Sequence, residues 1–241
     1  MNILIVGAGR AGTSFAAALS VTRRVTHRVT LVHHDAVTDF SNAQLVLLCV
    51  PDDAIAAFAA DLRVGADTVV AHVAGSRGLD VLAPHSRVGS LHPLLTMPDA
   101  ALGAQRLRGG IFSVEGDALL NDVVDSLEGQ IIVVSSELRA LYHATAASAA
   151  NHLVALLGHV QALARAAHLD LADFVPLARQ AFDDAVAYGP ARALTGPAAR
   201  GDLATIAAHL RSLPDDERDL YVALSERAMR LAQESETPWS A

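Results

Sequence analysis

The residues with the most evident chemistry stand near the start of the chain, where a glycine-rich segment follows a short apolar run. Residues 3–6 are expected to form a buried strand, and the next six are Gly7, Ala8, Gly9, Arg10, Ala11 and Gly12. In a GxGxxG turn from strand to helix, the glycines allow a tight turn, a close approach of pyrophosphate and close helix packing. The helix N-terminus adds free N–H groups for phosphate. We therefore expect these six residues to bind a dinucleotide; the alternative is a glycine-rich turn without a ligand.

The end of the second predicted strand bears on the choice between NAD and NADP. Asp35 could bind the adenosine ribose, which would favour NAD. His33 and His34, together with Arg10, would instead face a 2′-phosphate. Three basic groups outweigh one displaced acid, so NADP is the expected cofactor and NAD the alternative.

Two histidines are candidate proton donors for a reduction. His92 follows a strand and precedes a proline, which places it at the carboxyl edge of the sheet, where doubly wound sheets bind ligands. Imidazole titrates near neutrality and can donate a proton. His143 stands eight residues before Asn151, so the two lie about 80° apart on an α-helix, with small alanines between them. We predict His143 or His92 as the catalytic acid and Asn151 as a hydrogen-bond partner; the alternative is that the alanines mark helix packing.

Other strand ends supply further cofactor contacts. Val50 and Pro51 close one apolar run, and Gly75 and Ser76 close the next. We expect all four residues to line the cofactor site at the carboxyl edge of the sheet. His72, inside an apolar strand, is expected to be a core histidine.

A polar, turn-rich segment at residues 194–202 is a candidate substrate site. Thr195 can donate a hydrogen bond, Arg200 can bind a carboxylate with two parallel bonds, and Asp202 can cap the next helix. His209 lies four residues after Thr205 on one helix face and could line the same cleft. We predict substrate contacts from Thr195, Arg200 and His209; the alternative is a structural turn in which Arg200 pairs with Asp202.

The composition excludes several kinds of chemistry. All 18 basic residues are arginines, so a Schiff-base lysine, a phosphate-loop lysine and a lysine acid are all excluded. The net charge of −8 and the 4% aromatic content argue against a nucleic-acid partner. The 11 histidines form no tight ligand set, so no metal site is predicted.

The elements that must position these residues fall into two halves. Up to residue 135, apolar strands alternate with helices, which predicts a parallel sheet covered on both faces. Beyond it, helices are predicted over residues 135–167, 171–187, 202–213 and 215–235. The fold class is therefore α/β: a Rossmann-type domain over residues 1–135, followed by an all-helical domain over residues 136–241. The long first helix is apolar on several faces, which predicts a homodimer formed through the helical domain.

The N-terminus and the hydropathy predict a cytoplasmic location. The start of the chain lacks the charged, longer apolar pattern of a signal peptide, and no apolar run reaches the ~20 residues of a membrane span. Cys49, the single cysteine, lies in an apolar strand and is expected to be buried. The expected partner is a small-molecule substrate, with no membrane partner.

Several segments together resemble a known family. They are residues 48–55, 72–76, 89–94 and 194–202, and the Tyr142-His143 pair followed by Asn151. The chain resembles a Rossmann-like oxidoreductase family whose C-terminal domain has no assigned function. That family is related to ketopantoate reductase, to pyrroline-5-carboxylate reductase and to the 6-phosphogluconate dehydrogenase C-terminal superfamily.

The resemblance implies an NAD(P)-dependent oxidoreductase that reduces a small oxo acid. Related reductases use a lysine in the helix where this chain has His143, so an imidazole would have to take that role here. Two alternatives are an imine reductase similar to pyrroline-5-carboxylate reductase, and a non-catalytic module that binds or senses a dinucleotide.

Overall fold

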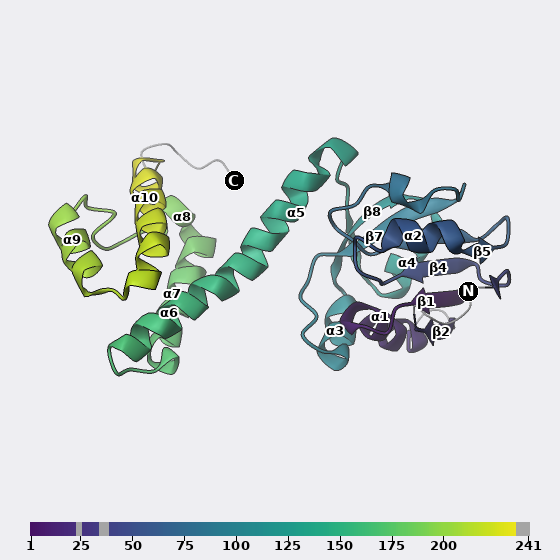
Figure 1. Ribbon diagram of the computed structural model, residues 1–241, viewed down its shortest axis with the longest axis horizontal. Coiled ribbons are helices and arrows are strands. Elements are labelled where there is room, and N and C mark those ends of the chain that lie inside the picture. Colours follow the sequence, from purple (N-terminus) through teal and green to yellow (C-terminus); the bar gives the residue numbers. More distant parts are fainter. Residues whose placement is uncertain (23–25, 34–38, 235–241) are drawn as a thin grey trace. The chain divides into compact units, whose positions relative to one another are not determined.

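The computed structural model describes residues 1–22, 26–33 and 39–234, and Figure 1 shows its helices and strands. The chain forms two compact units, Met1–Ala150 and Asn151–Ala241, which are taken in turn. His34 and Asp35, on which the choice of cofactor partly depends, lie outside the described residues.

The first unit is built on a sheet of mainly parallel strands (Figure 1). Over the described residues its order is β2 (Arg28–Val32), β1 (Asn2–Val6), β4 (Leu45–Leu48), β6 (Val69–His72), β7 (Val88–Pro93), β8 (Ile111–Gly116) and β9 (Gln130–Ile132). A small parallel pair, β3 (Asp39–Phe40) and β5 (Arg63–Val64), lies apart from it. The Rossmann-type fold predicted for this part of the chain is confirmed.

Two strands, β8 and β9, run opposite to the others and so depart from the predicted parallel sheet. β8 runs antiparallel to β7, whereas β9 is again parallel to β8. An apolar run predicts that a strand is buried but carries no information on its direction, so this reversal could not be seen in the sequence.

Helices cover both faces of the sheet. They are α1 (Arg10–Ser20), α2 (Ile55–Asp61), α3 (Ala100–Leu107), α4 (Leu119–Ser126) and the short 3₁₀ helix η1 (Leu79–Leu82). Ile3 and Ile5 of β1 belong to the core that includes α1, α3 and α4, whereas Leu4 and Val6 belong to the core that includes α2 and η1. This alternation follows from the two-residue period of a strand. Each fully buried aliphatic side chain contributes about 1.5–3 kcal/mol to the stability of the fold.

The first unit ends in a helix that returns to the sheet. The 3₁₀ helix η2 (Ser136–Leu138) leads into α5 (Arg139–Ala147), and a π-helical segment, Ser148–His152, follows. The boundary between the two units falls inside this segment. The helix predicted over residues 135–167 is confirmed in extent, because helical elements run from Ser136 to Ala166, but 3₁₀, α and π hydrogen bonding succeed one another along it.

The second unit is made of helices joined by turns, without a strand, over its described residues. Its elements are α6 (Leu153–Ala166), α7 (Leu171–Tyr188), α8 (Pro190–Ala193), α9 (Leu203–Ser212), the 3₁₀ helix η4 (Asp215–Glu217) and α10 (Arg218–Glu234). The predicted segments 171–187, 202–213 and 215–235 correspond to α7, α9 and η4 with α10. Over the described part of the chain, no helix is both long enough and apolar enough to cross a membrane.

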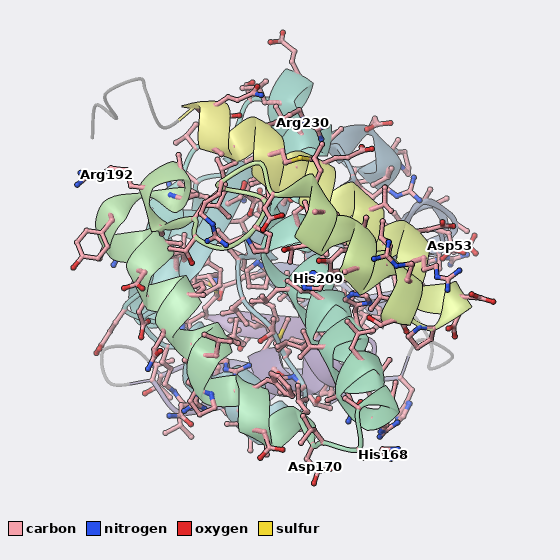
Figure 2. The ribbon with its side chains drawn as sticks, turned by 90° about the vertical axis from the view of Figure 1, so that its left-hand side faces the viewer. Asp53, His168, Asp170, Arg192, His209 and Arg230 are labelled. Carbon is pink, nitrogen blue, oxygen red and sulfur yellow. The ribbon has the colours of Figure 1, made fainter. Side chains whose placement is uncertain are left out.

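The turn between α6 and α7 shows how the chain ends one helix and begins the next. His168 has a positive φ of 59°, and Asp170 and Asp173 form a capping box at the start of α7. Figure 2 labels His168 and Asp170 in this turn. Such reciprocal caps satisfy N–H groups that the first turn of a helix leaves free.

Candidate functional site

The glycine-rich loop between β1 and α1 has the geometry expected of a dinucleotide-binding turn. Gly7 has a φ of +104°, and a Cβ atom there would lie 2.4 Å from the carbonyl oxygen of Cys49. A Cβ on Gly12 would lie 1.8 Å from the carbonyl oxygen of Gly7. Neither position tolerates a side chain, so both glycines are required for the loop to close onto the helix.

Gly9 differs from its two neighbours because the space beside it is open. Its φ is −73°, and a Cβ atom built on it would meet no atom within 4 Å. Gly9 is also the N-cap residue of α1, and no side chain caps this helix. The free N–H groups at the start of α1 thus face open space beside a bare backbone, an arrangement that fits a pyrophosphate.

Part of the predicted 2′-phosphate site lies beside this loop. The N–H of Gly7 donates to the carbonyl of Val32 at 2.9 Å, which joins the loop to the end of β2. His33 follows β2 directly and is exposed, as is Arg10 at the first position of α1. The described residues therefore retain two of the three basic groups on which the expectation of NADP rests.

Apart from the glycine-rich loop, a cluster of polar side chains lies on one face of the sheet around β7. Ser90 and His92 of β7 are paired with Glu115 and Ser113 of β8, and His72 of β6 is paired with Ser90. Side chains at paired positions point to the same face of a sheet. These five side chains therefore share one face, at strands whose opposite face packs into the apolar core through Leu91 and Phe112.

The start of α5 covers this polar face. Arg139, Tyr142 and His143 are spaced i, i+3 and i+4 and so lie on one side of the helix. Arg139 is buried, forms an ion pair with Glu115 and lies 3.5 Å from the Oγ of Ser90. A buried charge of this kind is stable only when it is paired. Glu115 supplies the opposite charge that the buried guanidinium requires.

His92 lies at the centre of the cluster. Its Nδ1 is 2.8 Å from the hydroxyl oxygen of Tyr142, and the two rings meet edge to face. The ring of His143 lies 6.0 Å from that of His92, centre to centre. A Cβ on Gly75 would lie 2.6 Å from the Nε2 of His92 and 2.8 Å from the Cδ2 of His143. The structure thus brings three of the predicted site residues together: His92, His143 and Gly75.

The surroundings of His92 keep its ring neutral. Burial, and then the nearby His143 and Arg139, lower the pKa of His92 to about 4. Burial also raises the pKa of Tyr142 above its usual value. At neutral pH, His92 therefore acts as a neutral imidazole with one donor and one acceptor nitrogen.

His72, expected to be a core histidine, is confirmed as one. It is fully buried, its Nε2 lies 3.1 Å from the carbonyl oxygen of Gly78, and its Nδ1 accepts from the N–H of Ala74 at 3.2 Å. Because a carbonyl only accepts, Nε2 carries the hydrogen. Burial lowers the pKa of His72 as well. Its two hydrogen bonds hold both ends of the loop that carries Gly75.

The two predicted strand-end loops are tied to each other. The hydroxyl of Ser76 donates to the Oδ2 of Asp52 at 2.7 Å, which joins the loop after β6 to the loop after β4, where Val50 and Pro51 lie. Asp52 does not cap the following helix, because Ala54 holds the N-cap position of α2. Its carboxylate is instead the acceptor that fixes Ser76.

Asn151 belongs to the second unit. It lies in the π-helical segment, whose hydrogen bonds span five residues instead of four. The 80° separation from His143 assumed a regular α-helix, so that estimate is wrong for this residue. The role of Asn151 stays a prediction.

The other predicted substrate residues also lie in the second unit. Thr195 and Arg200 are exposed in the turns that precede α9. Asp202 caps α9 as predicted, since it accepts from both the N–H and the hydroxyl of Thr205, at 3.0 and 2.7 Å. Its hydrogen-bonding partner is thus Thr205. His209, labelled in Figure 2, lies 2.6 Å through its Nδ1 from the hydroxyl of Tyr221 on α10.

Sequence reasoning gave no site role to five members of the cluster around His92, namely Ser90, Ser113, Glu115, Arg139 and Tyr142, although Tyr142 stands in a segment that carries the family resemblance. A signal for them was present: polar residues alternate within the apolar strands at 90 and 92 and again at 113 and 115. The spacing of 139, 142 and 143 also places three polar side chains on one helix face. What was missing was the pairing of β7 with β8, which sets these residues opposite one another.

Comparisons with known proteins agree with this fold. Residues 111–228 match a family described as a domain of unknown function (DUF2520), and residues 30–98 match the Rossmann-like domain. No curated protein matches the chain. The solved structures of similar fold include BF3122 from Bacteroides fragilis, described as a candidate NADP oxidoreductase, at 23% identity and a TM-score of 0.75, covering 95% of this chain and 98% of that one.

Two further solved structures extend the comparison. A reductive aminase from Aspergillus terreus, in complex with NADPH and ethyl levulinate, is 14% identical with a TM-score of 0.67 and 98% coverage of both chains. A 1-pyrroline-5-carboxylate reductase from Streptococcus pyogenes is 15% identical with a TM-score of 0.62, covering 95% of this chain and 98% of that one. These likenesses show a common fold: a Rossmann-type sheet followed by a helical region.

Proposed function

The chain joins a Rossmann-like domain to a DUF2520 domain, and from this combination we propose that it is an NADP-dependent oxidoreductase. The observation that carries the proposal is the loop at Gly9, where an uncapped helix N-terminus meets an open, side-chain-free backbone. Arg10 and His33, exposed beside this loop, favour NADP over NAD. The proposal is further supported by the NADPH-bound reductive aminase of similar fold.

Replacing Gly9 by alanine is expected to weaken NADPH binding at least tenfold, which is about 1.4 kcal/mol of binding free energy. The added methyl group would occupy the space in which the pyrophosphate approaches the backbone, while nothing in the protein obstructs it. Calorimetric titration of NADPH measures the affinity, and circular dichroism checks that the fold is retained.

Gly158→Ala is the matched control for this change. Gly158 lies inside α6, and a Cβ there also meets no atom within 4 Å. This variant should bind NADPH as the unaltered protein does, with a small gain in helix stability. If Gly9→Ala binds NADPH with unchanged affinity, the glycine loop is not the cofactor site and the proposal fails.

For the substrate, we propose a small oxo acid. When bound, the reduced nicotinamide supplies a hydride, so the carbonyl oxygen gains negative charge and needs a proton. His143 would donate that proton, or His92 would donate a hydrogen bond to the oxygen while water supplies the proton, since the chain has no lysine for either role. Arg200, with Thr195 and His209, would bind the substrate carboxylate, and Asn151 would orient the substrate.

An imine substrate is the second candidate, because its reduction does not require His92 to act as an acid. A histidine with a pKa of about 4 is not a protonated acid at neutral pH, and an iminium ion arrives with its proton already in place. NADPH oxidation measured against a panel of oxo acids and imines separates the two classes. Nucleotide binding without oxidation of NADPH on any member of the panel would instead indicate a binding or sensing module.

We also propose a homodimer formed through the helical unit. Among the described residues of this unit, the side chains of Ala164 and His159 are the buried ones, and α7 buries none. Leu177, Phe182 and Val186 of α7 are between 59% and 68% exposed. A helical unit of this size needs a core, and a second copy of the same chain would complete it.

Light scattering during size exclusion is expected to give the mass of a dimer at micromolar concentration. Phe182→Glu should shift the protein toward the monomer, because it places a charge on the apolar face. Gln180→Glu, an exposed position on the same helix, should leave the mass unchanged. A monomer of the unaltered protein at working concentration would rule the dimer out.

A further inference from the structure

The hydroxyl of Tyr142 is hydrogen-bonded to one of the two ring nitrogens of His92. It lies 2.8 Å from Nδ1, with the rings at 90° and their centres 5.5 Å apart. Tyr142 also hydrogen-bonds the side chain of Ser113, the β8 residue opposite His92. The other nitrogen, Nε2, is the ring atom nearest the position that a Cβ of Gly75 would take. Tyr142 and Ser113 therefore hold one side of the ring, and the opposite nitrogen faces the loop at the carboxyl end of β6.

The chemistry of the two groups decides which of them donates. A phenol with a pKa near 10 is a far stronger acid than a neutral imidazole N–H, and an unprotonated imidazole nitrogen is a stronger acceptor than a phenol oxygen. Tyr142 therefore donates to Nδ1, and the Ser113 hydroxyl is free to donate to the phenol oxygen. Burial keeps His92 in its neutral form, with the pKa near 4. A neutral ring that accepts at Nδ1 carries its single hydrogen on Nε2.

We propose that Tyr142 is a positioning residue that sets the tautomer of His92, so that Nε2–H is presented to the reacting group and the site takes a hydrogen-bond acceptor such as a carbonyl oxygen. The choice of substrate class rests on the proposed reductase function, whereas the tautomer does not. A carbonyl oxygen would accept from Nε2–H, and this bond strengthens as negative charge develops on the oxygen. The N–H of an iminium ion would instead face a second donor, which disfavours it.

The tautomer is read directly by long-range ¹H–¹⁵N spectra of protein labelled in its histidines, with the His92 signals identified by their loss in His92→Asn. The unaltered protein should show Nε2 protonated and Nδ1 unprotonated at pH 7. Tyr142→Phe should move both nitrogen shifts toward the averaged values of a ring that exchanges between tautomers. On an oxo acid, the same variant should lower kcat about tenfold to a hundredfold with little change in KM.

Tyr221→Phe is the matched control for the spectra. It removes the corresponding hydroxyl from Nδ1 of His209 in the second unit, so it should alter the His209 signals and leave those of His92 unchanged. A His92 ring that carries its hydrogen on Nδ1, or that is protonated at pH 7, overturns the proposal. If Tyr142→Phe fails to fold, the spectrum of the unaltered protein alone decides the tautomer.

The same experiments separate this proposal from the proposed function. Absence of NADPH binding would refute the reductase but would leave the tautomer measurement standing. An Nε2–H tautomer together with reduction of imines and not of oxo acids would overturn the substrate class inferred from Tyr142 while supporting a reductase.

Discussion

Replacing His92 by alanine is expected to lower kcat on an oxo-acid substrate by about 10² to 10⁴-fold, the range associated with loss of a positioned acid or donor. His92 holds the centre of the polar cluster beneath α5, and its Nε2 faces Gly75 at the carboxyl edge of the sheet. NADPH affinity should change little, because the pyrophosphate is expected at the glycine loop. In the unaltered protein, kcat should show no histidine titration between about pH 5.5 and 8, because the pKa of His92 is about 4. Steady-state kinetics across this range measure both effects.

His168→Asn serves as the control, because His168 is exposed in the turn between α6 and α7 and asparagine accepts its positive φ. His143→Ala should be tested beside His92→Ala, since the two rings are neighbours. If neither variant loses rate on a substrate that the unaltered protein reduces, a histidine does not supply the hydrogen and the mechanism is wrong.

The second large effect concerns stability, at the ion pair beneath α5. Glu115→Ala is expected to lower the free energy of unfolding by about 3–5 kcal/mol, because it leaves a buried guanidinium without its partner. Arg139→Met should cost less, because the Arg139 side chain is only 4% exposed and methionine can fill its space, whereas the Glu115 side chain is 29% exposed and can be solvated. Urea denaturation followed by circular dichroism measures both free energies.

The exposed ion pair between Arg227 and Glu234 on α10 provides the comparison. Its atoms are 2.9 Å apart, but both side chains are more than half exposed. Glu234→Ala should therefore change the free energy of unfolding by no more than about 1 kcal/mol. Equal losses from Glu115→Ala and Arg139→Met would contradict the asymmetry that the burial of Arg139 implies.

Much of the fold could be predicted from the sequence because the strands bury both faces. The runs at 3–6 and 45–48 are apolar throughout, and the glycines at 7, 9 and 12 mark the turn that follows the first of them. The reversed direction of β8 and β9 could not be predicted, because burial is the same for either direction. The π-helical segment at 148–152 was missed because its composition is that of an ordinary helix.

The candidate site was predicted only in part, because the sequence locates the ends of strands but not the register between them. His92 and Gly75 were found because strand ends can be located from the sequence alone. Tyr142 and Arg139 were not, because their importance depends on partners in β7 and β8 that only the register of the two strands brings opposite α5. A helix face is visible in a sequence, but the strand residues that it meets are not.

The π-helical segment has a consequence for how this chain is aligned with its relatives. A π turn contains one residue more between hydrogen-bonded groups than an α turn. A helix can therefore accommodate one inserted residue as a π turn and continue as a helix on either side. A relative that lacks one residue between 148 and 152 would have an uninterrupted α-helix, and residues beyond that point would need a one-residue gap in the alignment. Which residue of that relative aligns with Asn151 would then depend on where the one-residue gap is placed, and a difference at this position need not be a substitution.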